Sequence, residues 1–133
     1  MIDVGDRPED TLIEFVRAWF RLLARAEWEE ALAAIDEPNV YGIRWTRDEV
    51  TGLLQDTFGA GTRFEAEHGP PVFSDPDSAA GAAHHSFGRL NAGGFWLDHD
   101  VPLNGRYSDL TAQFEFLPRD RRFAVQLHGL HVL

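Results

Sequence analysis

The stretch Asp100–Phe116, DVPLNGRYSDLTAQFEF, decides the fold of this chain. Its Asn104-Gly105 pair stands between two alternating polar and apolar runs, which is the strongest short-range indication of a tight β-hairpin. A two-residue turn fixes the register of the strands that it joins. Strict pairing from this turn puts Asp100 opposite Asp109 on the polar face and gathers the apolar side chains on the other. The sequence therefore predicts a hairpin that places two carboxylates side by side.

The sequence on both sides of this hairpin continues as an antiparallel meander. Alternating or apolar runs suited to strands cover residues 82–90, 95–103, 106–117 and 122–133. The connections between them are short: Gly-rich at 92–94, Asn104-Gly105, and PRDR at 118–121, which we take as a four-residue loop. The second half of the chain is thus expected to form a sheet.

The first sixty residues have the period of helices instead. Pro8 suits the first turn of a helix whose apolar residues recur every three or four positions through Leu23. A short second helix is expected over residues 27–36, and the capping box TRDE at 46–49 opens a third, which ends at Gly59. The arginines at positions 17, 21 and 25 line one side of the first helix, and we expect that side to face solvent.

Helices followed by an antiparallel meander predict an α+β fold, with the N-terminal helices packed on one face of the sheet. We expect a single domain over residues 1–133, with a helical part at 8–60 and an antiparallel sheet at 70–133. The segment FVRAWFRLLARAEWEEALAAID, a long helix, a tight break and a short helix, resembles the nuclear transport factor two-like, cystatin-like cone superfamily. That resemblance implies a curved, cone-like sheet wrapped around the long helix. The closing PLNGRYSDLTAQFEF and LHGLHVL resemble uncharacterised bacterial domains with a Ser-Asp-Leu-Thr motif.

The composition limits the function classes. The formal net charge of −10 disfavours binding to nucleic acid or to an anionic membrane surface, and it favours a basic partner. The absence of cysteine excludes thiolate chemistry and disulfides, and the absence of lysine excludes a lysine Schiff base. The acidic N-terminal segment has none of the apolar core of a signal peptide, so the expected location is the cytoplasm of a bacterium.

The polar face of the predicted sheet supplies the first candidate site. If Gly129 forms a β-bulge, His131 comes to lie opposite Asp109, and His128 lies near Thr111. The candidate catalytic residues are therefore Asp109, Asp100 and His131. Facing like charges destabilise a sheet, so a shared proton, a ligand or a neighbouring cation should offset them. A carboxyl group with a shifted pKa beside a histidine suits general acid–base catalysis.

The apolar face supplies a second candidate site. His99 is the one polar residue in the series Phe95, Leu97, His99, Val101 and Leu103, so it should point towards the helices. In cone-shaped folds that side often encloses a ligand pocket, and His99 with His85 or His84 and Trp45 could line it. A buried, hydrogen-bonded core histidine is the alternative interpretation.

The sequence predicts neither a metal site nor a cofactor. His84 and His85 point to opposite faces of a strand, and His128-x-x-His131 spans a glycine rather than a helical turn. No phosphate-binding glycine loop or nucleophile elbow is present.

Three functions stay open at this point. The first is binding of a small molecule in a cone-type pocket, with or without isomerase- or lyase-like acid–base chemistry. The second is an immunity-type acidic protein that neutralises a basic partner. The third is a homodimeric scaffold assembled through Trp96 and Tyr107 on the polar sheet face, since aromatic residues are enriched at interfaces.

Overall fold

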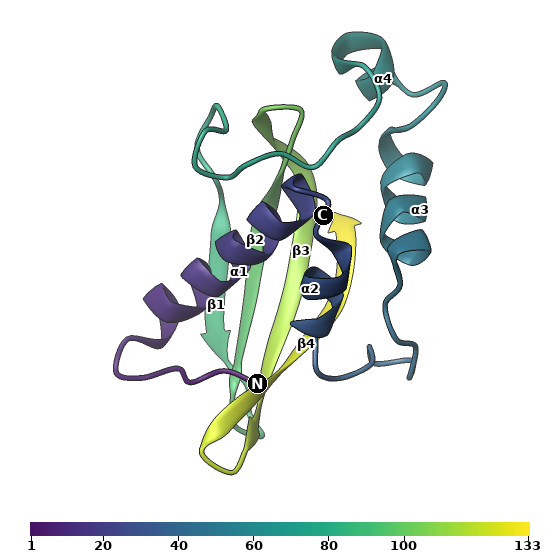
Figure 1. Cartoon of the computed structure of the whole chain (residues 1–133). Helices are drawn as coiled ribbons and strands as arrows, with labels where there is room; N and C mark the ends of the chain where they lie inside the picture. The colour runs from purple at the N-terminus through teal and green to yellow at the C-terminus, as the bar shows by residue number, and fades with distance from the viewer.

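The computed structural model describes all residues from 1 to 133 and confirms the α+β fold. Four helices come first: α1 (Pro8–Ala24), α2 (Trp28–Ala33), α3 (Arg47–Phe58) and α4 (Arg63–His68). Four strands follow: β1 (His85–Arg89), β2 (Phe95–Leu103), β3 (Arg106–Arg119) and β4 (Arg122–Val132). The strands form one open, curved antiparallel sheet in the order β1-β2-β3-β4 (Figure 1). No helix is long and apolar enough to cross a membrane.

The helices pack on one face of this sheet. Figure 1 shows α1 and α2 crossing the sheet, while α3 stands beside its β4 edge. α1 is amphipathic, and its apolar side enters a core of 23 buried residues that draws on α1, α2, α3 and the sheet. Trp19 is anchored there, because its indole N–H donates to the Ala31 carbonyl of α2 at 2.9 Å. The rings of Trp19 and Phe114 also meet edge to face at 5.3 Å.

Local sequence explains where the helices begin. Thr46 caps α3 by accepting a hydrogen bond from the Glu49 amide, which confirms the N-cap of the predicted capping box but not the reciprocal bond from the Thr46 amide to the Glu49 side chain. The same arrangement at Thr62 and Glu65 opens α4, a helix that the sequence analysis did not foresee. The expected helical part, 8–60, therefore extends to His68.

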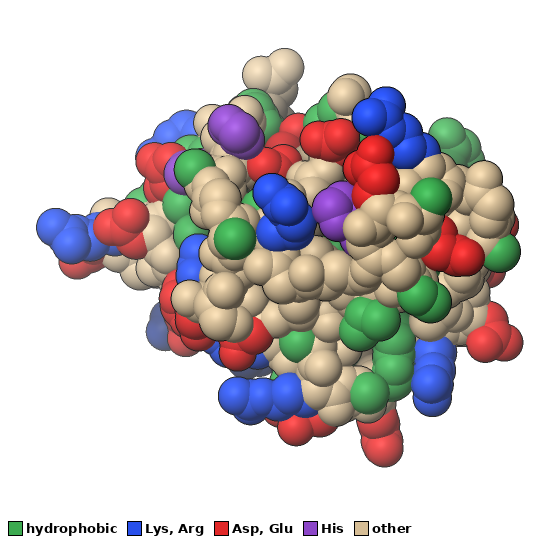
Figure 2. Space-filling view, turned by 90° about the horizontal axis from the view of Figure 1, so that it is seen from above, with side chains coloured by type: hydrophobic (Ala, Val, Ile, Leu, Met, Phe, Trp, Pro, Cys, Tyr) green, Lys and Arg blue, Asp and Glu red, His purple; other side chains and the backbone are tan.

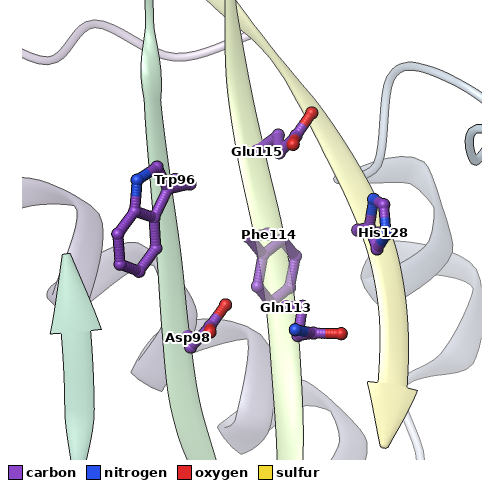
Figure 3. Close-up of a pocket in the computed structure, with 6 residues that line it drawn as sticks. All are labelled: Trp96, Asp98, Gln113, Phe114, Glu115 and His128. Carbon is purple, nitrogen blue, oxygen red and sulfur yellow. The ribbon is translucent and has the colours of Figure 1, made fainter. Parts of the chain in front are cut away.

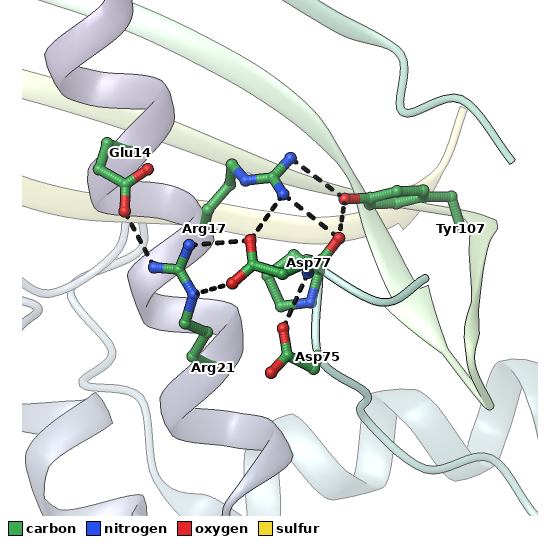
Figure 4. Close-up of polar contacts among 7 residues, drawn as sticks. Glu14, Arg17, Arg21, Asp75, Asp77 and Tyr107 are labelled. Carbon is green, nitrogen blue, oxygen red and sulfur yellow. Dashed lines mark hydrogen bonds and ion pairs between the residues drawn. The ribbon is translucent and has the colours of Figure 1, made fainter. Parts of the chain in front are cut away.

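The segment between α4 and β1 forms a strap, residues 69–84, that is fastened to α1. Asp77 accepts hydrogen bonds from Arg17 at 2.9 Å and from Arg21 at 2.8 and 3.0 Å (Figure 4). Tyr107 of β3 completes the contact, because its hydroxyl donates to the Pro76 carbonyl and accepts from Arg17. The prediction that this side of α1 faces solvent is therefore wrong for Arg17 and Arg21.

The Asn104-Gly105 turn is present, but the register of the β2–β3 hairpin differs from the strict pairing. Pro102 pairs with Tyr107 as expected, whereas Asp100 pairs with Thr111 rather than with Asp109. Ser108 explains the shift: its hydroxyl donates to the Val101 carbonyl at 2.6 Å and accepts from the Leu110 amide at 3.2 Å. This side chain bonds to the backbone within the ladder, and β3 bulges there.

The β3–β4 hairpin also differs from the prediction. Arg119 pairs with Arg122, so the connection is a two-residue turn rather than the four-residue PRDR loop. A bulge does occur beside Gly129, but it brings His131 opposite Thr111 instead of Asp109. Beyond this bulge Leu130 is buried in the core, whereas Val132 is 51% exposed.

Candidate functional site

The face of the sheet opposite the helices carries the polar residues, and we call it the open face. The side chains of β2 alternate between buried and half-buried, so every second residue belongs to this face. Its cross-strand neighbours form three rows: Trp96 with Glu115 and Gln126, Asp98 with Gln113 and Gly129, and Asp100 with Thr111 and His131.

A hollow of about 320 Å³ lies over the first two rows, and we call it the main hollow. Figure 3 shows Trp96 and Asp98 on β2, Gln113 and Glu115 on β3, and His128 on β4 around it. Three neighbouring strands thus contribute one or two polar groups each to a single depression. A concave surface with a few convergent polar groups is the usual form of a small-molecule site.

Trp96 forms one side of the main hollow, and Gly88 determines where its ring lies. A Cβ atom at Gly88 would come within 2.5 to 2.7 Å of three atoms of the Trp96 indole. The ring therefore rests directly on the backbone of β1, at a position where any larger residue would displace it. The glycine holds a flat aromatic surface beside the polar groups of β2 and β3.

Asp98 lies at the centre of the site and is partly shielded from water. Burial raises the pKa of the Asp98 carboxyl above its ordinary value, while Gln113 and the positive charge of a protonated His128 act in the opposite direction. The Nδ1 atom of His128 is itself buried and has no hydrogen-bond partner. The site thus contains a carboxyl group whose ionised form is disfavoured by burial and, beside it, a histidine with one unpartnered nitrogen below the surface.

A second, smaller hollow of about 150 Å³ adjoins the main hollow, because Asp98 lines both. Asp100, Thr111 and His84 also line the smaller hollow. Asp100 is held in place by His84, whose backbone amide and Nδ1 both donate to the carboxylate, at 2.9 and 3.1 Å. Asp98 and Asp100 therefore provide two carboxylates along one side of β2.

The three candidate catalytic residues are not assembled as the sequence suggested. The bulge at Ser108 leaves the Asp109 side chain exposed, and the predicted contact between Asp109 and Asp100 is wrong. Asp100 and His131 do share a row, on either side of Thr111. His128 does not lie beside Thr111. It lines the main hollow together with Asp98.

The second candidate site is brought together only in part. His85 and His99 stack with their ring centres 6.1 Å apart, and Phe20 of α1 lies 5.4 Å from His99. Trp45 is elsewhere: its indole N–H donates to the Leu127 carbonyl of β4 at 2.8 Å, and it lines a separate hollow with Arg44 and Ile35. His99 lines neither hollow of the open face.

His99 has the surroundings of a core residue. It is only 1% exposed, and its Nδ1 donates to the Asp100 carbonyl at 2.7 Å. Burial is the main reason why the pKa of His99 lies below its ordinary value of 6.5, and the nearby charges of His85 and Arg17 act in the same direction. Nδ1 carries a proton in this geometry, because a carbonyl oxygen can only accept a hydrogen bond.

The interface predicted for a scaffold dimer also changes. Tyr107 pairs with Pro102 and directs its hydroxyl to Pro76 and Arg17, on the helix side of the sheet. Trp96 and Tyr107 therefore do not form one aromatic surface. Trp96 instead lies opposite Glu115.

The sequence predicted only some of the residues that line the main hollow. Alternation along β2 placed Trp96 and Asp98 on the polar face, but the strict register paired them with the wrong residues of β3. The informative feature was Ser108, which follows the turn and can bond to the backbone in place of a ladder partner.

The assembled groups define what the open face can do chemically. A carboxyl, an amide and an imidazole surround an indole, so the main hollow can hydrogen bond to a small polar molecule and exchange a proton with it. No group of three or more His, Asp or Glu side chains is placed to hold a metal ion. Comparison with protein-family models, curated proteins and solved structures yields no match to this chain.

Proposed function

We propose that this protein binds a small polar molecule in the main hollow, against Trp96 and within reach of Asp98 and His128. One observation carries the proposal: the Trp96 indole and the polar side chains of Asp98, Gln113, Glu115 and His128, from three neighbouring strands, converge on one hollow, where burial disfavours ionisation of Asp98. A concave surface with several convergent polar groups is the usual form of a small-molecule site, so a bound polar molecule is a natural hydrogen-bond partner for these side chains.

A protein-observed NMR screen tests the proposal directly. Fragments that carry hydrogen-bond donors and acceptors on a flat ring should shift the Trp96 indole resonance together with those of Asp98 and His128. Asp98→Asn and Trp96→Ala should each weaken the hits about tenfold or more, since each removes a direct contact. Asp120→Asn, at the exposed β3–β4 turn, is the matched control and should leave affinity unchanged. Hits that map only to other surfaces would contradict the proposal.

The same pair of residues gives the site a capacity for acid–base chemistry. A carboxyl group with a raised pKa and a nearby imidazole can remove a proton from one atom of a bound molecule and return it to another. An isomerase- or lyase-like activity would use them in this way. Exchange of an acidic C–H proton of a bound hit in D₂O, followed by NMR, should be faster with the wild type than with Asp98→Asn. Equal exchange rates would exclude Asp98 as the base.

The proposed site lies on the open face and not between the helices and the sheet. On the helix side, aromatic rings pack against His99 and fill the space that a pocket would need. The helices on a curved antiparallel sheet support a second proposal, that the chain belongs to the nuclear transport factor two-like superfamily. We also propose that this protein is bacterial and cytoplasmic, and that it forms a homodimer. Sedimentation with and without Trp96→Ala distinguishes a dimer through the open face from ligand binding there.

A second candidate function rests on a different surface, the turn before α3. Val40, Tyr41 and Ile43 are 51%, 83% and 49% exposed on a turn that Asn39 braces, because its side chain accepts from two backbone amides. The carboxylates of Asp48 and Glu49 follow directly, and neither takes part in an ion pair. An apolar centre beside acidic side chains fits a basic partner protein, as expected for an immunity-type neutraliser.

The partner hypothesis predicts two effects on the affinity of a purified basic partner. Tyr41→Ala should weaken binding about tenfold or more, as expected for an interfacial aromatic anchor, and rising salt should weaken it further. Val72→Ala removes another exposed apolar side chain, on the strap, and is the control. Affinity that is insensitive to both Tyr41→Ala and salt would reject this function. On the face seen from above, acidic and basic side chains are interspersed (Figure 2).

A further inference from the structure

The charged side chains that line the two hollows all have the same sign, apart from the histidines. Glu115 and Asp98 line the main hollow, and Asp98 and Asp100 line the smaller one. Neither hollow is lined by an arginine, and the chain contains no lysine. An anionic ligand would therefore meet two carboxylates in either hollow and no permanent positive charge.

The carboxylates of the main hollow have no basic partner, in contrast to three other carboxylates of this protein. Asp77 is held by Arg17 and Arg21, Glu37 by Arg119 and Glu67 by Arg63. Asp98 and Glu115 take part in no ion pair, although both are half-buried at the middle of the sheet. A partly shielded carboxylate is costly without a counter-charge.

Trp96 adds a second feature that favours a positive ligand. Its ring is fixed on Gly88 and lines the main hollow, with Glu115 as its direct cross-strand neighbour and Asp98 two positions along the same strand. Indole faces attract ammonium and guanidinium groups within about 6 Å of the ring centre. A cation bound in the main hollow would thus meet an aromatic ring and two carboxylates in the same lining, a combination that suits organic cations.

From this geometry we infer that the ligand of the main hollow is an organic cation, an amine, amidine or guanidine attached to a flat or aliphatic body. The inference rests on the proposed ligand-binding function and specifies its substrate class. The volume of about 320 Å³ is at the small end of ligand sites, so the cation is a small molecule rather than a peptide segment. The net charge of −10 also raises the local concentration of cations by long-range attraction.

The ionisation of Asp98 provides a readout that is independent of affinity. Its pKa is raised mainly because burial disfavours the carboxylate. A cation bound beside it stabilises the carboxylate, so binding should lower this pKa and release a proton while Asp98 is partly protonated. A neutral ligand that merely covers Asp98 should have the opposite effect, since further burial disfavours the charge.

A matched set of aromatic probes tests the inference with the intact protein. Benzamidine, benzamide and benzoate have similar shapes and carry charges of plus one, zero and minus one. By NMR titration on the Trp96 indole resonance, benzamidine should bind about tenfold more tightly than benzamide, because of the cation–π and carboxylate contacts. Glu115→Gln and Asp98→Asn should each reduce that preference severalfold, while Asp120→Asn should preserve it. A second comparison uses phenethylamine, a flexible cation, and phenethyl alcohol, its neutral counterpart.

The outcomes separate the two proposals. If benzamide or phenethyl alcohol binds at Trp96 as tightly as its cationic counterpart, the cation inference is overturned and the ligand site stands. If benzoate binds at Trp96 more tightly than benzamidine, the cation inference is likewise overturned and the ligand site stands. If no probe of any charge perturbs Trp96, the inference fails, and if the wider fragment screen also leaves Trp96 unperturbed, the proposed function fails with it.

Discussion

At the scale of single residues, Asp98 is the group whose charge state matters most for the open face. The fold raises its pKa above the 3.8 of an unfolded aspartate, so the folded state favours the protonated carboxyl. That contribution to stability is present below pH 3.8 and is lost as the pH rises through the raised folded pKa. Asp98→Asn cannot ionise, so it should gain stability relative to wild type across this window, by less than about 1 kcal/mol because the site is partly open to solvent.

Urea unfolding at a series of pH values from acid to neutral measures this difference. Asp120→Asn is the control for loss of one surface charge. A difference between wild type and Asp98→Asn that does not change with pH would show that the Asp98 carboxyl is not perturbed by the fold.

His99 leads to the reverse pH dependence. Burial lowers its pKa in the folded protein below 6.5, so the unfolded chain takes up a proton first as the solution is acidified. The contribution of neutral His99 to stability is therefore present above pH 6.5 and is lost as the pH falls towards its folded pKa. His99→Phe keeps a ring beside Phe20 but cannot be protonated, so its stability should fall less steeply over that interval.

The test is the slope of the free energy of unfolding against pH, compared between the two proteins. His68→Phe, on α4 and outside the core, is the matched control. Identical slopes for wild type and His99→Phe would mean that the imidazole is free to titrate in the fold.

At the scale of secondary-structure elements, the bulge in β3 depends on one side chain. Ser108→Ala removes the hydrogen bond to the Val101 carbonyl and the acceptor for the Leu110 amide. Val101 and Leu110 are buried, so the protein should lose about 1–2 kcal/mol of stability, measured by urea unfolding. Ser78→Ala, in the strap, should change stability little. Equal effects of the two substitutions would show that the hydroxyl of Ser108 does not maintain the bulge.

The packing of β1 under Trp96 leads to a second prediction for an element. Gly88→Ala would place a methyl group within 2.5 to 2.7 Å of the indole, so the ring must move away from the strand. Because β1 is a short edge strand, we expect a change in the Trp96 indole resonance and weaker ligand binding, with most of the stability retained. Gly52→Ala meets no neighbouring atom and lies in a helix, so it should leave the indole unchanged and add about 0.5–1 kcal/mol. An unchanged Trp96 resonance in Gly88→Ala would contradict the assigned position of the ring.

Sequence reasoning was most successful for elements and least successful for register. β2 has the boundaries that its alternation predicted, and the Thr46 cap and the Asn104-Gly105 turn were both found. These features are encoded by neighbouring residues. Register depends instead on bonds such as that between Ser108 and Val101, which join side chain and backbone across strands and leave no periodic pattern. The candidate site moved from Asp109 to Asp98 for that reason.

At the scale of the whole molecule, the strap joins α1 to the end of the β2–β3 hairpin. Its ends are held by backbone hydrogen bonds, such as Ser74 to Pro102 and Ala80 to Gly105, whereas its middle depends on Asp77. The two guanidinium groups hold the pKa of the Asp77 carboxyl well below its usual range, so this contact persists at all physiological pH values. The strap should therefore respond to mutation of Asp77 and to salt rather than to pH.

Asp77→Asn should loosen the middle of the strap without unfolding the protein. Hydrogen exchange of the backbone amides at 75–79 should become faster, while amides of β2 and β3 keep their protection. Glu14→Gln removes only the outer partner of Arg21 and should leave the strap protected, which makes it the control. Faster exchange throughout the sheet would instead show that the strap and the core unfold together.

The shifted register of the β2–β3 hairpin also has a competitor, the regular register that the turn alone would give. A hairpin that zips regularly from Asn104-Gly105 keeps its apolar side chains on one face, so it is a competing structure that the growing sheet could adopt. In that structure Asp100 and Asp109 face each other, and their repulsion raises its free energy. In the native sheet Asp109 is exposed and Asp100 is bound by His84, so the same two charges carry no such cost. Repulsion between Asp100 and Asp109 thus favours the native register over the regular one, although the two side chains are not paired in the native sheet.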